Sequence, residues 1–555
     1  MYMSSSLLAL KKTAAELLAS AVLDLFPNVQ LYRPYISNIT FGYDFILNEP
    51  VDEHVLSLIE HKIGVLAKSH CQIHEIEMMR ENAAELFRFQ GQKVLAEMIL
   101  EIEDSVVPIV RIDRFHDLAT PGFPVDSSLL KYFRLLGTET YTALNPFSEE
   151  PYTVVRFEGI ACEDQYTLKK VFKRWKEGKK NTSANEIWDS NLFVPCESRV
   201  FALPHGAMIL EAIKDWVTVF YQQHGFELVS SPDKAFIENL MEGRVQESPF
   251  GLSHALLYLL SPLEIEEKPT AWVEFGQLSE IKENYLPTNL LDLGNYHTDQ
   301  GHLFVSKEQL EVQLISSLHF INKTVKMLVS EFQWVLCSRV SKVPGTGKLW
   351  EHCLSLLKKG LDTCEIPYEI EDITELTTGP RVEVRWIDAR GKSWKGPYLG
   401  VDLLNPTQVK LKQNKSSVYM LELSLLGSWE RLIAILMEQR KGLFPFWLAP
   451  EQIRILPISE PCNGYASQVK AELKKRGFRV AVDASDEKLG TKVHAAECRG
   501  IPCLLILGKE EKEKETVSVR WRHEQKLRNG IGLEELLKEL PSPVPTEELK
   551  GQLES

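Results

Sequence analysis

The sequence predicts a multidomain protein that combines α+β and α/β architecture. The chain has 555 residues. At about 150 residues per domain, this length corresponds to about three or four domains. The first segment, to about Gly178, mixes helical and strand patterns, which predicts an α+β arrangement. The part from Ala449 alternates strand and helix, which indicates βαβ units with a mostly parallel sheet.

Changes in composition set the predicted domain boundaries. The stretch from Lys173 to Ser190 is charged and polar, which is typical of a linker. After it, a long amphipathic segment (Ala207 to His224) and strand signals at Arg381 to Asp388 and Gln408 to Leu411 predict a sheet with flanking helices. The predicted divisions are residues 1–178, a linker at 179–190, residues 191–448, residues 449–540 and a mobile tail at 541–555.

Composition excludes several classes of protein. The hydrophobic content of 44% and the charged content of 25% are those of a globular protein, not of a disordered or fibrous one. The nine cysteines form no Cys-x-x-Cys pair, so we expect a reducing cytoplasm. No run of about 18 uncharged apolar residues occurs, which predicts no membrane span. The net charge of -14 excludes a globally basic nucleic-acid binder, so any RNA contact must be regional.

Five stretches, in this order, carry a family resemblance: Phe26–Phe45, His224–Pro232, Glu274–Phe304, Leu425–Leu436 and Leu443–Ser459. Together they resemble threonyl-tRNA synthetases, which are class II aminoacyl-tRNA synthetases. The resemblance implies an editing-domain-like region at 1–178 and a class II synthetase-like antiparallel sheet at 191–448. It also implies an anticodon-binding-like domain at 449–540.

The resemblance implies that the ATP site is degraded. In the family, an arginine of a His-Arg-Asn-Glu run steadies the charge that develops on ATP, and Glu280 stands there in this sequence. The two arginines of a later Met-Arg-Val-Arg run are Asp292 and Gly294 here. Charges about 4 Å apart interact by about 4 kcal/mol at an effective dielectric near 20, so an acid in place of a cation turns attraction into repulsion. Arg431 alone remains where the family's motif 3 arginine meets ATP.

The resemblance also implies that threonine recognition is lost. The family binds zinc through one cysteine and two histidines, of which only His302 is kept. Gly251 and Glu422 replace the other two ligands, and a zinc site normally needs at least three from the protein. The aspartate that holds the substrate amine is Gln300, and two pocket glutamines fall on Lys395 and Gly400. We therefore expect no cofactor, with both zinc and ATP binding lost.

Proofreading in the family uses a His-x-x-x-His helix and a Cys-Arg-Gly-Pro-His stretch. The matching positions are Lys12 and Glu16 in the first motif, and Ala119 and Phe123 in the second. Of these, only Glu16 is a base, and it lacks the partners that would position water and substrate. The resemblance thus implies that editing is lost too.

The part of the sequence that resembles the anticodon-binding domain keeps candidate tRNA contacts: Glu487, Lys488, Arg520 and Arg522. Arginine pairs with phosphates and base edges, which suits an RNA reader. A protein partner is the other possibility. The family's motif 1 proline, Pro232 here, lies near the dimer interface, so we expect a homodimer.

The sequence thus predicts a catalytically inactive threonyl-tRNA synthetase-like protein that binds tRNA or a protein partner. Two alternatives stay open. One is an enzyme of the same fold with altered ligase chemistry, and the other is an active threonine-tRNA ligase.

Overall fold

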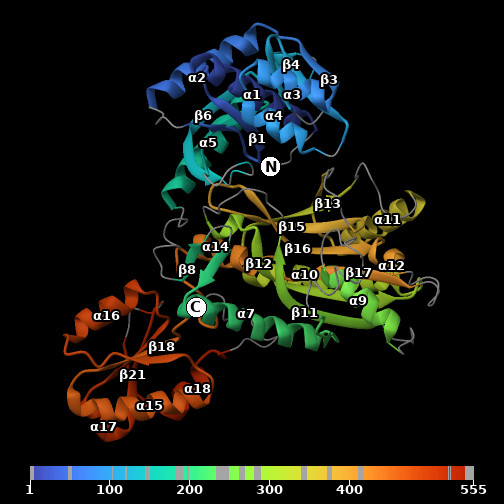
Figure 1. The fold of residues 1–555 in the computed structure, drawn as a ribbon. Helices are drawn as coiled ribbons and strands as arrows, with labels where there is room; N and C mark the ends of the chain where they lie inside the picture. Colours follow the sequence, from blue (N-terminus) through green and yellow to red (C-terminus); the bar gives the residue numbers. More distant parts are fainter. Residues whose placement is uncertain are drawn as a thin grey trace. The chain divides into compact units, whose positions relative to one another are not determined.

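The computed structural model divides the chain into two compact units, which are described separately (Figure 1). The first consists mainly of Met1–Thr182, and the second contains most of the residues that follow. The structure describes residues 5–47, 53–102, 104–118, 122–124, 126–143, 145, 147, 151–181, 192–196, 199–232, 249–261, 269–279, 289–338, 347–371, 378–409, 418–522, 524 and 527–543.

The first unit contains two antiparallel sheets. One has the strand order β1-β2-β7-β6 and the other β3-β4-β5. The strands are β1 Gln30–Ile36, β2 Thr40–Ile46, β3 Ile73–Met79, β4 Val106–Ile112, β5 Phe115–Leu118, β6 Tyr132–Ala143 and β7 Tyr152–Cys162. The helices are α1 Ser5–Leu25, α2 Glu53–Lys68, α3 Arg80–Phe89, α4 Lys93–Leu100 and α5 Gln165–Asn181.

Helix α1 is buried on most of its circumference. It packs against α2 and against strands β1, β2 and β7, so its apolar residues join the core of this unit. Lys11 and Glu16 are each only 1% exposed. A charged side chain is rarely buried without a partner, so this helix carries polar groups whose contacts need an explanation.

The second unit is built on an eight-stranded sheet of order β10-β11-β12-β17-β16-β15-β13-β14. Its inner pairs are antiparallel, and the edge pairs β10/β11 and β13/β14 are parallel. The predicted antiparallel core sheet is therefore confirmed. The strands are β10 Glu227–Leu228, β11 Thr270–Ser279, β12 Asn295–Val305, β13 Phe332–Cys337, β14 Tyr368–Glu371, β15 Arg381–Ile387, β16 Ser393–Asp402 and β17 Tyr419–Ser424. A separate two-stranded sheet pairs β8 Phe193–Cys196 with β9 Arg199–Ala202.

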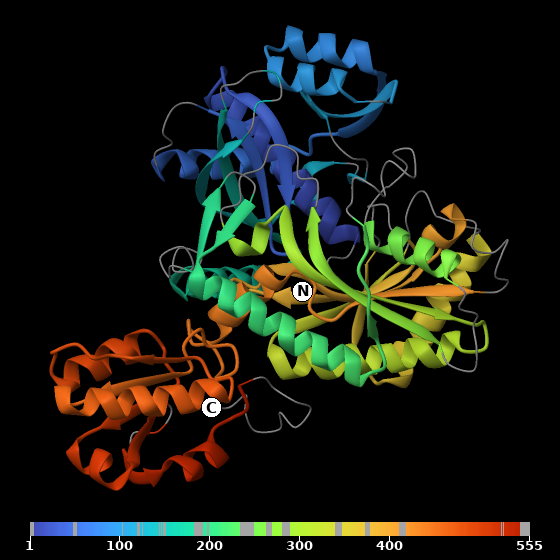
Figure 2. The same ribbon diagram turned by 60° about the horizontal axis from the view of Figure 1, so that its bottom comes forward.

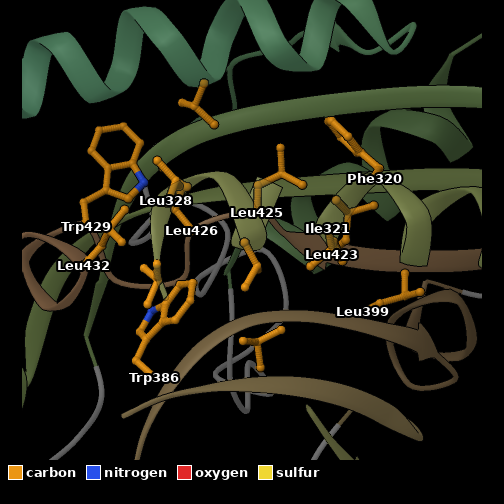
Figure 3. Packing of buried hydrophobic residues seen from close by; sticks show 14 of the residues in the cluster. Phe320, Ile321, Leu328, Trp386, Leu399, Leu423, Leu425, Leu426, Trp429 and Leu432 are labelled. Atoms are coloured by element: carbon orange, nitrogen blue, oxygen red, sulfur yellow. The ribbon is translucent and has the colours of Figure 1, made fainter. Parts of the chain in front are cut away.

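Two apolar clusters hold this sheet. The larger one joins the sheet to helices α7 Pro204–Gln223, α10 Leu310–Leu328, α11 Gly347–Thr363 and α14 Trp429–Gln439. Figure 2 shows α7 lying along the sheet, and Figure 3 shows Phe320 and Ile321 of α10 near Leu423 and Leu425. The smaller cluster joins β11 and β12 to helix α9 Pro249–Leu260. Helix α12 (Asn405–Gln408) occupies part of a segment for which a strand was predicted, and that prediction is wrong at Gln408.

The last part of the chain forms a five-stranded sheet of order β19-β18-β20-β21-β22. Strands β19, β18 and β20 are parallel to one another, β21 is antiparallel to β20, and β22 is antiparallel to β21. Helix α16 packs on one face and helices α15 and α18 on the other, which confirms the predicted βαβ domain. The elements are β18 Ile453–Pro457, α15 Asn463–Lys475, β19 Val480–Val482, α16 Leu489–Cys498, β20 Cys503–Leu507, α17 Lys509–Lys514, β21 Thr516–Trp521, β22 Arg528–Gly532 and α18 Leu533–Glu539.

Two predicted connecting segments lie partly outside the described residues. In the linker predicted at 179–190, residues 179–181 still belong to α5, and the rest is not described. In the tail predicted at 541–555, the described part ends at Pro543, whose carbonyl accepts a hydrogen bond from Gln452 Nε2 at 3.3 Å. Among the described helices, none has the length and apolarity needed to cross a membrane.

Candidate functional site

The face of the eight-stranded sheet that faces α9 carries a row of polar side chains. Side chains alternate between the two faces of a strand, so Gln300 and His302 of β12 lie on the same face. The adjacent strand β17 places Glu422 directly opposite His302, and β16 places Gly400 opposite Glu422. Gln300, His302 and Glu422, three positions expected from the resemblance, therefore lie close together.

His302 is held by a second histidine. Its Nδ1 lies 2.7 Å from Nδ1 of His254, which projects from α9. The other ring nitrogen of His254 lies 3.1 Å from Glu274 Oε2. Glu274 also accepts hydrogen bonds from the backbone N–H (2.7 Å) and the hydroxyl (2.6 Å) of Ser231. These four residues, which we call the histidine chain, form a continuous hydrogen-bonded path.

Burial and hydrogen bonding shift the pKa of two members of the histidine chain. Burial, reinforced by His254, holds the pKa of His302 well below its usual value, so its imidazole is neutral. Burial alone would raise the pKa of Glu274, but the hydrogen bonds from His254 and Ser231 bring it below its usual value. An ionised Glu274 is an acceptor, so His254 donates to it from Nε2, and in the contact between the two Nδ1 atoms one ring donates and the other accepts.

Glu422 has partners of its own. The Thr378 hydroxyl donates to Glu422 Oε1 at 2.5 Å, and burial raises the Glu422 pKa. The nearby Asp402 is also fully buried, and both its burial and Glu422 raise its pKa. Asp402 binds the amide of Asn405 at 2.7 Å. Burial thus shifts both acids towards their protonated forms, and a protonated carboxyl binds metal ions poorly.

The residues at the predicted zinc position do not fit zinc. A Cβ added at Gly251 would lie 2.7 Å from Asn405 Nδ2, so a cysteine there would have to displace an amide that Asp402 holds. His302 uses its Nδ1 for His254. Within the part of the chain that the structure describes, no group of three histidine, cysteine or acidic residues is placed to hold a metal ion.

Arg431, the cation kept at the nucleotide position, faces the protein. It is 4% exposed. Its Nε donates to the carbonyl of Leu291 at 2.8 Å, and its Nη1 donates to the carbonyl of Lys395 at 2.9 Å. The guanidinium also lies 5.5 Å from the ring centroid of Tyr296. The guanidinium that the resemblance would assign to ATP thus donates its hydrogen bonds to protein carbonyls.

The other residues of the predicted ATP and threonine sites are placed as follows. Asp292 ends a short 3-10 turn, directly after the Leu291 carbonyl that Arg431 binds, and Gly294 precedes β12. Gln300 is 1% exposed, accepts a hydrogen bond from the Tyr398 hydroxyl at 2.8 Å and donates to Thr298 at 3.3 Å. Glu280 lies outside the described residues.

In the first unit, the structure brings together three of the four predicted editing positions. Lys12 and Glu16 lie one turn apart on α1, and Lys12 Nζ lies 5.8 Å from the ring centroid of Phe123. Burial, followed by the neighbouring Asp117, raises the pKa of Glu16 well above its usual value. Asp117 in turn accepts from the Tyr43 hydroxyl at 2.5 Å. Ala119 lies outside the described residues.

The predicted RNA contacts differ in accessibility. Glu487 and Lys488 are exposed, and Lys488 caps α16. Arg520 is paired with Glu497 at 2.6 Å, with both side chains partly exposed. Arg522 donates to the carbonyls of Gly500 (2.7 Å) and Phe444 (3.0 Å). It therefore links this domain to the segment that precedes it. Pro232 is exposed.

The sequence analysis missed His254 and Glu274. His254 lies three residues after Gly251 on α9, so the helical period places both on one face. That spacing was the available signal. Glu274 stands at the start of the stretch that matches motif 2, but nothing in the sequence shows that it would contact a residue of α9.

Comparisons with known proteins agree with this architecture. The family described as "Anticodon binding domain" matches residues 452–542. The threonine–tRNA ligase of Lawsonia intracellularis is 27% identical over 543 residues, covering 92% of this chain and 84% of the relative. The threonine–tRNA ligase of Helicobacter pylori (strain HPAG1) is 28% identical, covering 94% and 90%.

Solved structures show the same fold. The RNA-binding domain of threonyl-tRNA synthetase from Cryptosporidium parvum superposes with a TM-score of 0.57 at 22% identity, covering 67% of this chain and 99% of that one. A threonyl-tRNA synthetase structure from Aeropyrum pernix gives 0.52 at 20% identity, covering 68% and 97%.

The antiparallel sheet, the βαβ domain that follows it and these matches define a class II synthetase fold with an anticodon-binding domain. Within that class, the chain is a threonyl-tRNA synthetase-like protein, because relatives of that kind match over more than nine tenths of it.

Proposed function

We propose that this chain is a noncatalytic relative of the threonyl-tRNA synthetases that binds tRNA. The observation that carries the proposal is the burial of Arg431. The side-chain hydrogen bonds from its Nε and Nη1 both end on protein carbonyls. Freeing it for a nucleotide would break two bonds to a charged group, each worth about 1.5–3 kcal/mol. The acid Asp292 stands in the same turn as one of these carbonyls.

The histidine chain supports the same proposal for the amino acid pocket. A zinc ion would have to take His302 away from His254, with no cysteine at Gly251 and with a buried Glu422 that already accepts from the Thr378 hydroxyl. In the family, that metal reads the substrate amine and hydroxyl. Without it, and with Gln300 tied to Tyr398, threonine has no matching recognition groups.

We propose that editing is absent as well, and that residues 1–178 act as a structural remnant of an editing domain. Glu16 is 1% exposed and favours its protonated form, so it cannot take a proton from water. Lys12 is directed towards the aromatic ring of Phe123. These contacts hold α1 in place without leaving a general base in reach of substrate.

The tRNA-binding part of the proposal rests on the match to the anticodon-binding domain and on exposed side chains near α16 and β21. Lys488 and Arg520 offer cationic contacts to phosphates. Arg522 is engaged at the domain junction, so it contributes less. We further propose a cytoplasmic homodimer that uses the Pro232 region.

An active threonine–tRNA ligase is the second candidate. The names of the relatives favour it over an inactive protein, because the curated relatives described above are threonine–tRNA ligases. The substitutions at Glu280, Asp292 and Gly251 argue against it. An enzyme of the same fold with altered ligase chemistry would need a new phosphate-binding cation besides Arg431.

Two assays test the proposal. Filter binding of total tRNA over a range of salt concentrations should show retention. The logarithm of the binding constant derived from it should fall linearly with the logarithm of the salt concentration. Charging of tRNA with radiolabelled threonine should stay at the level of a protein-free blank, while the Helicobacter pylori relative charges its tRNA under the same conditions. Absence of tRNA retention, or threonine charging above the blank, would overturn the proposal.

A further inference from the structure

A cavity of about 600 Å³ lies where α14, the segment after it and the end of α16 meet. Its volume falls in the range of about 300–1,000 Å³ that is typical of small-molecule sites. Apolar side chains, including Met437, Leu443 and Ile501, form part of its lining. None of the residues assigned above to ATP, zinc, editing or tRNA belongs to that lining, so the cavity is separate from those sites.

The charged side chains of the lining are mostly cationic. Lys441, Arg499 and His205 line the cavity and are exposed. Glu451 is the one acid in the described lining, and Arg454 holds both of its carboxylate oxygens, at 2.7 and 2.6 Å. The bidentate pair cancels the Glu451 charge, so Lys441 and Arg499 set the sign of the charge at the cavity.

Two further arginines, Arg522 and Arg440, add to this positive charge near the cavity. Arg522 binds the carbonyl of Gly500, a lining residue. Burial, followed by the nearby Arg440, lowers the pKa of Arg522. Helices α14 and α16 both end at the cavity, and each end carries about half a negative charge. The two helix ends offset only about one of these four cationic charges.

Residues that follow the ends of α14 and α16 form part of the wall. Lys441, Gly442 and Gly500 all have positive φ, at 54°, 77° and 68°. A Cβ added at Gly500 would lie 2.9 Å from Leu443 Cδ2, so the two walls pack closely beside the opening. Lys441 and Arg499 therefore line a cavity whose two walls are in close contact beside its opening.

We propose that this cavity binds a phosphorylated nucleoside, either as a free nucleotide or as one residue of an RNA strand. The apolar lining offers a surface for the base, while Lys441 and Arg499 take the phosphate. Arginine forms bidentate hydrogen bonds with phosphate oxygens, and lysine acts as a point charge. Only the RNA form of the ligand rests on the proposed tRNA binding.

Alkylation of Cys498 can report on ligand binding, because this residue is exposed and lines the cavity. The test measures the alkylation rate of Cys498 by iodoacetamide with peptide mass spectrometry, using the partly exposed Cys71 of the first unit as internal reference. The probes are AMP, adenosine, inorganic phosphate and total tRNA. AMP or tRNA should slow Cys498 at least fivefold without changing Cys71, and adenosine should protect less than AMP.

Variants assign the effect to the cavity. Arg499→Glu should lose most of the protection, and Lys509→Glu, on the exposed helix α17, should keep it. Protection by tRNA alone assigns the RNA form, and protection by AMP alone assigns the free nucleotide. Equal protection by adenosine and AMP, or none by either AMP or tRNA, would overturn the inference. If filters retain tRNA but neither AMP nor tRNA protects Cys498, the inference about the cavity fails while the proposed tRNA binding stands.

Discussion

His254 and His302 meet with their Nδ1 atoms 2.7 Å apart, one on α9 and the other on β12. This pairing joins a helix to the sheet at the position where the family binds zinc. Glu274 Oε2 lies 3.1 Å from the other ring nitrogen of His254, so both nitrogens of that ring have a partner. If the site is the structural link proposed above, substitutions in it should affect stability and not metal content.

His302→Ala should lower the free energy of unfolding by about 1–3 kcal/mol, because it leaves the buried His254 nitrogen without its partner. Urea denaturation measures this change. The exposed His205→Ala is the matched control and should change stability by less than about 0.5 kcal/mol. Zinc analysis of the purified protein should give the same substoichiometric content for both variants. A stoichiometric metal that His302→Ala removes would contradict this account.

Glu16→Gln should stabilise the protein at neutral pH. The pKa of Glu16 is raised above its unfolded value of about 4.5, so its favourable contribution is present below that pH and is lost as pH rises towards the folded value. We expect the variant to gain on the order of 1–2 kcal/mol at pH 7 and little at pH 4. Thermal unfolding at both pH values measures this difference, with the exposed Glu139→Gln as control. An equal effect at both pH values would contradict the prediction.

Glu383→Gln should destabilise the protein strongly. Glu383 lies 2.6 Å from Arg381 Nε and 2.7 Å from Arg385 Nη2. Burial would raise its pKa, but the two arginines lower it to about 2. Its contribution is thus present above pH 4.5 and is lost as pH falls towards 2. Loss of one member of a buried ion cluster typically costs about 3–5 kcal/mol.

Urea denaturation of the wild type and Glu383→Gln at pH 7, 5 and 3 provides the check. The difference between the two proteins should be largest at pH 7 and should shrink at pH 3. A difference that does not depend on pH would show that packing, and not charge, sets the role of Glu383.

Arg520 and Arg522 lie two residues apart on β21 and should respond differently to alanine. Arg522→Ala should lower stability by about 1.5–3 kcal/mol, because its guanidinium binds two backbone carbonyls. Arg520→Ala should cost under about 1 kcal/mol, since its ion pair is exposed. In filter binding, Arg520→Ala should reduce the salt slope for tRNA by about 0.7, as expected for one phosphate contact on single-stranded RNA. Unchanged tRNA binding would remove Arg520 from the proposed interface.

The sequence predicted the elements whose patterns are local. The βαβ alternation after Ala449 has its counterparts in β18, α15, β19, α16 and β20, and the strand signal at Arg381 to Asp388 corresponds to β15. The sequence failed where local pattern and context disagree. A strand was predicted at Gln408 to Leu411, but Gln408 belongs to helix α12, at whose start Asp402 Oδ1 accepts from the Asn405 N–H.

The candidate site was predictable only in part. The resemblance placed His302, Glu422 and Gly251 in one site, and the strand register brings the first two side by side. It could not show that His254 would bind His302, because the two residues are 48 positions apart. Nor could it show that α1 would bury Lys11 and Glu16. Such pairings depend on tertiary packing, which a single sequence does not encode in a local pattern.

Threonine-dependent exchange of pyrophosphate into ATP tests the central claim most directly, because it isolates amino acid activation from tRNA binding. With Arg431 tied to the carbonyls of Leu291 and Lys395, we predict exchange no higher than in a protein-free blank at saturating threonine and ATP. Exchange that requires threonine and is abolished by Arg431→Ala would contradict the account and establish an active enzyme.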